Sequence, residues 1–134
     1  ALDKRVTFLA PVHDAMCDYE AEIHGVAGGW PHYFYKENKA LGAAWKETEL
    51  TELEKARLEG ARYYDGVNFA RRITVPGWYS FGYNDEVVPP TSSYGLYNSV
   101  KAPKTLSLYQ MTGHYWYQEQ WDEWQAWIIQ QLTK

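Results

Sequence analysis

Two residues of this sequence, Asp85 and His114, have the types and positions needed for acid–base chemistry. Asp85 follows residues 73–82, an apolar and aromatic-rich run that ends at Gly82. Ligands bind just outside the carboxyl ends of the strands in open α/β sheets, so a carboxylate there is a candidate for chemistry. On this stretch alone the ordinary interpretation, a turn, is favoured, because Asp and Asn hydrogen bond to nearby backbone groups.

His114 follows a second apolar run, residues 105–109, and lies 29 positions after Asp85. Two adjacent parallel strands would bring both residues to the same rim of a sheet. A buried carboxylate that orients a histidine is the acid–base half of a nucleophilic triad. The α/β-hydrolase order is Ser, Asp, His, and this chain presents the second and third members in that order. A Gly-His turn after a strand is also compatible with a plain loop.

The order of the predicted elements indicates an α/β fold. Strands are predicted near residues 5–10, 75–82 and 105–109, a largely helical insertion near 14–62, and helices near 91–100 and 118–132. Such alternation implies parallel strands joined by right-handed crossovers. Locally, Pro11 is expected to end the first strand, Asp14 to cap a short helix, and Thr91 or Ser92 to cap a later one.

Composition excludes several classes of protein. A length of 134 residues suits one domain, and a net charge of −4 argues against a nucleic-acid binder. No apolar run is long enough to predict a membrane span. Cys17 is the single cysteine, and His13, His24 and His32 lack the spacing of a metal site. We therefore expect neither a metal nor a cofactor.

The aromatic content, with seven Trp and twelve Tyr, fits either a dense core or a pocket that stacks on rings. Tyr115 and Trp116 directly follow His114, so they are candidates for the floor of a sugar or acyl pocket. They could equally pack against the last helix. A non-catalytic carbohydrate-binding module would explain the aromatic content, with residues such as Trp30 stacking on sugar rings, but not the ordered Asp85 and His114.

Several segments resemble the acetylxylan esterase/cephalosporin C deacetylase family, carbohydrate esterase family 7. They are Tyr-Asp-x-Val-Asn-Phe-Ala at 64–70, Asp-x-x-x-Pro-Pro-Thr-Ser at 85–92, and Gly-His at 113–114; residues 5–11 and 17–18 also fit. The resemblance covers nearly the whole chain. It implies that Asp85 is the triad acid and His114 the general base. Val88 replaces a cysteine of many relatives, and the aromatic residues after His114 also differ, so the ester is not identified.

The resemblance further implies that residues 1–134 are a partial domain, the C-terminal half of an α/β-hydrolase, with three parallel strands and flanking helices. The nucleophile elbow Gly-x-Ser-x-Gly would lie just upstream of Ala1, because none of the five serines has glycine two residues away on both sides. The expected parent enzyme deacetylates acetylated xylo-oligosaccharides or similar small esters, and the 134 residues alone are expected to be inactive.

Two expectations concern partners and alternatives. Without its N-terminal half, the first strand would present an unpaired edge, so we expect self-association, a homo-oligomer, or pairing with the missing half. A peptidase or dienelactone-type hydrolase of the same fold would share the triad but not residues 67–69. The compartment is not decided by the sequence.

Overall fold

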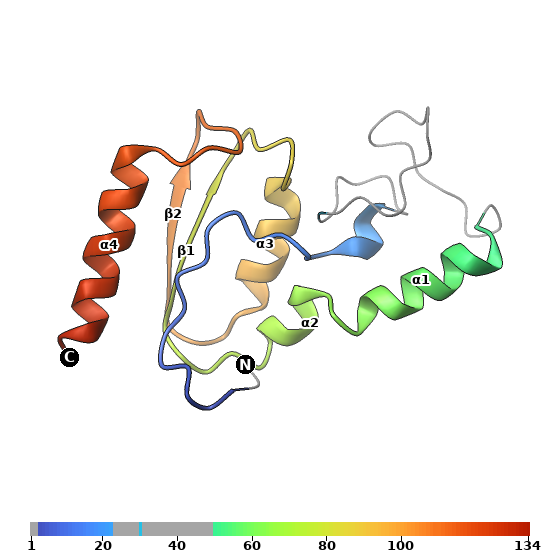
Figure 1. The fold of residues 1–134 in the computed structure, drawn as a ribbon, viewed down its shortest axis with the longest axis horizontal. Coiled ribbons are helices and arrows are strands. Elements are labelled where there is room, and N and C mark those ends of the chain that lie inside the picture. Colours follow the sequence, from blue (N-terminus) through green and yellow to red (C-terminus); the bar gives the residue numbers. More distant parts are fainter. Residues whose placement is uncertain (1–2, 23–29, 31–49) are drawn as a thin grey trace.

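The computed structural model describes residues 3–22, 30 and 50–134. Within these residues the elements are η1 (Tyr19–Glu22), α1 (Glu52–Arg62), α2 (Gly66–Ala70), β1 (Gly77–Gly82), α3 (Pro90–Ser99), β2 (Lys104–Tyr109) and α4 (Gln118–Leu132). Strands β1 and β2 lie side by side between α3 and α4 (Figure 1). The two later strands and the last helix therefore form where the sequence predicts them.

Strand β1 is the centre of the fold, and all six of its residues are buried. It pairs in parallel with β2. Because side chains alternate across a strand, β1 serves two layers. On one face Phe81 packs edge-on against Tyr94 of α3, with ring centroids 4.9 Å apart. On the other, Ser80 Oγ accepts a 2.7 Å hydrogen bond from Gln120 Nε2 of α4.

The first predicted strand, at residues 5–10, is not a regular strand. The described residues form a two-stranded sheet rather than three strands, and the N-terminal segment meets β1 only in isolated parallel bridges at Leu9 and Val12. Pro11 does not end this pairing, since the His13 N–H still donates to the Ser80 carbonyl at 2.9 Å. Proline has no N–H to donate, so the ladder is interrupted at Pro11 and regular pairing is lost.

Two helix caps also differ from the expectation. Asp14 caps no helix; it is buried, and the first helical turn is η1. Helix α3 has no side-chain cap, because its N-cap residue is Pro89, whose side chain has no acceptor. Pro90 follows in the first turn, where it has no N–H group that needs a partner. Helix α1 has a capping box in which Thr51 and Glu54 satisfy each other's backbone N–H groups.

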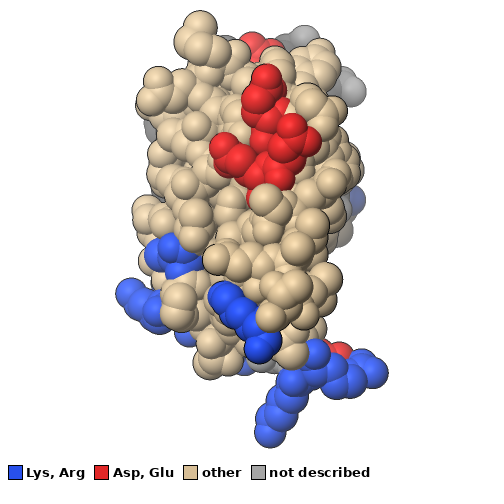
Figure 2. Space-filling model, turned by 90° about the vertical axis from the view of Figure 1, so that its left-hand side faces the viewer, with Lys and Arg blue, Asp and Glu red and all other residues tan. Residues whose placement is uncertain are grey.

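Helix α4 fastens the N-terminal segment to the sheet. The indole N–H of Trp124 donates to the Ala10 carbonyl at 2.9 Å, and Phe8 packs edge-on against Trp127. Glu119 lies in the first turn of α4, where the helix dipole stabilises a negative charge. Figure 2 shows acidic side chains gathered toward one end of this side of the molecule and Lys and Arg toward the other. None of the helices in the described ranges is long and apolar enough to cross a membrane.

The end of β1 is packed closely against the turn that carries His114. A Cβ atom at Gly82 would lie 2.5 Å from the Gly113 carbonyl oxygen and closer still to that of Thr112. These neighbours are backbone atoms, so only glycine lets the two strand ends approach in this way. At Gly60, on the exposed side of α1, a Cβ would meet no atom within 4 Å.

We predict that Gly82→Ala lowers the free energy of unfolding by about 1–3 kcal/mol, because the added methyl group overpacks this junction. The matched control, Gly60→Ala, should raise it by up to about 1 kcal/mol, because alanine favours a helix over glycine. Urea unfolding monitored by tryptophan fluorescence measures both. A shift of the two midpoints in the same direction would contradict the prediction.

Candidate active site

Asp85 lies in the turn that follows β1, and its side chain is completely buried. Oδ1 accepts the backbone N–H groups of Val87 at 2.9 Å and Val88 at 2.8 Å. This is the turn-forming role that Asp commonly has. It occupies only one of the two carboxylate oxygens, so Oδ2 is left for other donors.

Asp85 Oδ2 contacts two histidines. His114 Nδ1 lies 2.8 Å away, as does His13 Nδ1. The structure thus brings Asp85 and His114 together at the rim of the sheet, as the positions of the strand ends predict. The two histidines differ in exposure, because the His114 side chain is 42% exposed and that of His13 only 6%. Their ring centroids are 4.7 Å apart.

The environment of Asp85 favours its charged form. Burial raises the pKa of the carboxyl, but hydrogen bonds from the Val88 N–H, from His114 and from the Val87 N–H outweigh burial and hold the pKa below its usual value. The carboxylate is therefore ionised at neutral pH and can only accept hydrogen bonds. Both ring nitrogens that face it must carry a proton.

His13 was not expected at this site. In the sequence, His13 is considered only as a metal ligand together with His24 and His32, and those two histidines lie outside the described residues. The rule that selected Asp85 and His114 applies to His13 as well, since it follows the first predicted strand. The sequence predicts that this strand ends at Pro11, so His13 is not expected at the strand end. In the structure the chain stays paired to β1 as far as His13.

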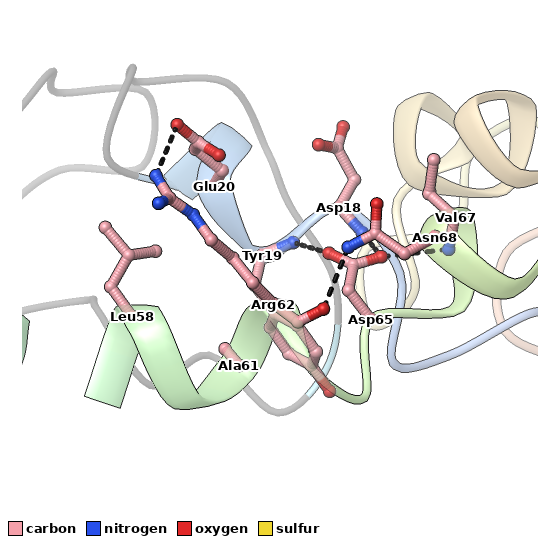
Figure 3. A pocket seen from close by; sticks show the side chains of 9 residues that line it. All are labelled: Asp18, Tyr19, Glu20, Leu58, Ala61, Arg62, Asp65, Val67 and Asn68. Atoms are coloured by element: carbon pink, nitrogen blue, oxygen red, sulfur yellow. Dashed lines mark hydrogen bonds and ion pairs between the residues drawn. The ribbon is translucent and has the colours of Figure 1, made fainter. Parts of the chain in front are cut away.

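The loop that carries His13 has an unusual backbone. His13, Met16 and Asp18 have φ angles of 51°, 56° and 59°, in the left-handed region that non-glycine residues seldom adopt. Such conformations persist only where surrounding contacts determine them. Asp65 supplies these contacts by accepting the backbone N–H groups of Asp18 and Tyr19, each at 3.0 Å (Figure 3).

Asp65 also caps α2, because its Oδ1 accepts the Val67 N–H at 2.9 Å. The next residue, Gly66, donates its N–H to the Met16 carbonyl at 2.8 Å and has Cys17 Sγ close to its α-carbon. Asp65, which anchors this loop, therefore also lines the cavity drawn in Figure 3. In physical terms, the Asp-Gly pair of the 64–70 segment holds the His13 loop.

Two cavities flank His114. One, of about 350 Å³, is lined by Val12, His13, Ala15, Trp30, Val87, Val88, His114 and Trp116. The other, of about 390 Å³, is lined by Asn84, Glu86, Val87, Gly113, His114 and Tyr115. Trp116 also stacks on Trp121 of α4, with centroids 4.2 Å apart. Trp116 thus packs against the last helix and also lines a cavity beside His114, and its role in a sugar or acyl pocket stays a prediction.

None of the five serines, all within the described residues, hydrogen bonds to a histidine. Ser80, Ser92, Ser99 and Ser107 bond to Gln120, Pro89, Gly95 and Glu123, and the buried Ser93 hydroxyl has no partner. Cys17 is no substitute nucleophile, because burial raises the pKa of its thiol and its Sγ bonds to the Ala15 carbonyl.

His13, Asp85 and His114 also place three possible ligand atoms within 4.8 Å of one another. A nitrogen that donates a proton to the carboxylate cannot coordinate a metal at the same time. Hydrogen bonding accounts for both 2.8 Å contacts without an ion.

Comparison with known proteins shows the family of the chain. The family model described as acetyl xylan esterase (AXE1) matches residues 1–131. The chain belongs to the acetyl xylan esterase family. An acetyl esterase of Xylanibacter ruminicola, Axe7A, is 36% identical over 114 residues, which are 85% of this chain and 23% of that protein.

Solved acetyl xylan esterases share the fold. The enzyme from Paenibacillus sp. R4 superposes with a TM-score of 0.71 at 23% identity, covering 96% of this chain and 39% of the other. Acetyl xylan esterase 1 from Thermoanaerobacterium sp. JW/SL YS485 gives 0.66 at 21% identity, covering 94% and 38%. The chain thus has the α/β fold of part of these esterases and spans less than half the length of the relatives it matches.

Asp14, the residue after His13, differs from Asp85 in its hydrogen-bond partners and in the direction of its pKa shift. It is buried, and its Oδ2 has no hydrogen-bond partner in the part of the chain that the structure describes. Burial raises the pKa of Asp14 to about 7. The unfolded chain releases this proton near pH 4. Folding stability should therefore fall as the pH rises from about 4 to 7, and the loss is complete above pH 7.

We predict that Asp14→Asn removes this fall, because an amide cannot ionise. The expected gain over the wild type at pH 8 is up to about 4 kcal/mol, and at pH 4 it should be small. Denaturant unfolding across this pH range measures the effect. The exposed control Asp122→Asn should follow the wild type, and an Asp14→Asn variant with the wild-type pH slope would refute the assignment.

Proposed function

We propose that this chain supplies the acid and the base of a serine esterase triad that removes acetyl groups from esters. The observation that carries the proposal is the 2.8 Å contact between buried Asp85 and half-exposed His114 at the ends of neighbouring strands. His114 receives its orientation from Asp85, and the exposure of its ring leaves it accessible to a nucleophile and a substrate. Membership of the acetyl xylan esterase family supports the same reaction class.

In the proposed reaction, His114 acts through Nε2, because Nδ1 donates to Asp85. Nε2 takes the proton of a serine hydroxyl from outside residues 1–134 as that oxygen attacks the ester carbonyl. His114 then gives the proton to the departing sugar oxygen, which leaves an acetyl-enzyme. Water repeats the cycle, acetate departs and the serine regains its proton. Asp85 stabilises the positively charged imidazole that forms in each half of the reaction.

The proposed substrates are acetylated xylo-oligosaccharides or similar small esters. Trp116 and Tyr115 each line a cavity next to His114, and aromatic faces suit sugar rings. The relatives described above are an acetyl esterase and acetyl xylan esterases, which fits this substrate class. We assign Trp116 to the apolar side of the substrate and Tyr115 to the polar side, where Asn84 and Glu86 also lie.

We predict large losses of kcat when the pair is changed in the intact protein that carries this segment. Asp85→Asn should lower kcat for an aryl acetate by about 10⁴, because the carboxylate no longer selects the tautomer of His114. His114→Ala should lower it by about 10⁶, because the base is removed. Asp122→Asn is the control, and a chelator should leave activity unchanged. Full activity of either site variant, or loss with a chelator, would refute the triad.

We also predict that residues 1–134 alone do not hydrolyse aryl acetates above the buffer rate. The base has no serine partner in the described residues, and the oxyanion donors that follow a nucleophile elbow are expected elsewhere. Spectrophotometric release of the phenol, with the His114→Ala chain as background, measures this. A burst of phenol that depends on His114 would contradict it.

A further inference from the structure

We propose that His13 is a positioning residue: it donates its Nδ1 proton to Asp85 Oδ2 and holds the carboxylate in the orientation that His114 requires. The geometry by itself supports the hydrogen bond, because Nδ1 and Oδ2 are 2.8 Å apart and both side chains are buried. Its importance for catalysis rests on the function proposed above.

The two histidines are not equivalent, although they share one oxygen. Each must carry a proton on Nδ1, and in a neutral ring Nε2 is then the acceptor. The His13 Nε2 is buried and has no hydrogen-bond partner within the described ranges. The ring of His13 is thus enclosed, and it hydrogen bonds to Asp85. His114, with 42% of its side chain exposed, is the ring that a nucleophile and a substrate can reach.

The carboxylate of Asp85 depends on His13 because the carboxylate is buried and has no contact with solvent. Its four donors are the N–H groups of Val87 and Val88 on Oδ1 and the two rings on Oδ2. If His13 is removed, a fully buried oxygen keeps a single donor, and that donor is the ring that must change its charge in every turnover. With His13 present, Oδ2 stays held whatever His114 does.

The backbone places the His13 ring and also defines the best test variants. The His13 N–H is fixed to the Ser80 carbonyl at 2.9 Å, and its φ is 51°. Asparagine tolerates this conformation and carries a side-chain N–H close to the position of Nδ1, whereas glycine tolerates it and offers no donor. His13→Asn and His13→Gly therefore form a pair that differs in the hydrogen bond and not in backbone strain.

The hydrogen bond is tested by nuclear magnetic resonance of the intact protein labelled with ¹⁵N-histidine. We expect two slowly exchanging, downfield ring N–H protons on Nδ1, assigned to His13 and His114. His13→Asn should lose the first and keep the second, while His13→Gly should lose the first and broaden the second through faster exchange with water. A His13 ring protonated on Nε2, or a second signal unaffected by glycine, would overturn the proposal.

The positioning role is tested by steady-state kinetics on the same variants with an aryl acetate. His13→Gly should lower kcat by about 10- to 100-fold with KM little changed, because the carboxylate and the base are misplaced. His13→Asn should restore most of kcat. Equal kcat for the glycine variant and the wild type would overturn the role, as would an asparagine variant no better than glycine.

The two failures can be told apart. An intact protein that shows both downfield protons but hydrolyses no acetyl ester would refute the proposed function and leave the hydrogen bond standing. An active esterase whose His13→Gly variant keeps the wild-type kcat would refute the positioning role alone. Circular dichroism of both variants checks that each is folded.

Discussion

The structure depends above all on one buried, ionised carboxylate, Asp85. A buried charge is tolerated only where hydrogen bonds replace the water it has lost. Asp85 obtains four of them, from its own turn, from the loop after β2 and from the loop after the N-terminal segment. These four hydrogen bonds join three parts of the chain at one rim of the sheet. The same contacts orient His114 for the chemistry proposed, so the stability of the charge and the geometry of the site have one cause.

The rest of the fold brings those donors within reach. Gly82 lets the ends of β1 and β2 come close, and Asp65 pins the loop that carries His13 by accepting backbone N–H groups. Asp14 shows what happens to a buried carboxyl without such donors. Burial dominates there and raises the pKa to about 7, whereas hydrogen bonds hold the pKa of Asp85 below its usual value. The hydrogen-bond partners of Asp85, and the lack of a partner for Asp14 Oδ2 among the described residues, thus explain why the pKa values of these two buried carboxyls shift in opposite directions.

Membership of the acetyl xylan esterase family gives this arrangement a context. The chain spans 38–39% of the solved esterases that share its fold, and within that part a carboxylate and a histidine meet at adjacent strand ends. The second histidine on the acid adds a feature that a Ser-His-Asp description does not include. The buried ring of His13 is suited to hold the carboxylate, while the exposed ring of His114 faces the cavities beside it.

The sequence by itself determined the α/β order, the positions of β1, β2 and α4, and the meeting of Asp85 with His114. These follow from local hydrophobic patterns and from the rule that parallel strands end at one rim. Only the tertiary structure placed His13 on Asp85, 72 residues away. It also decided that the N-terminal segment pairs past Pro11, that Asp14 is buried and that Trp116 both stacks on Trp121 of α4 and lines a cavity. The physical reason is that burial and hydrogen-bond partners are set by long-range packing, which local residue patterns do not encode.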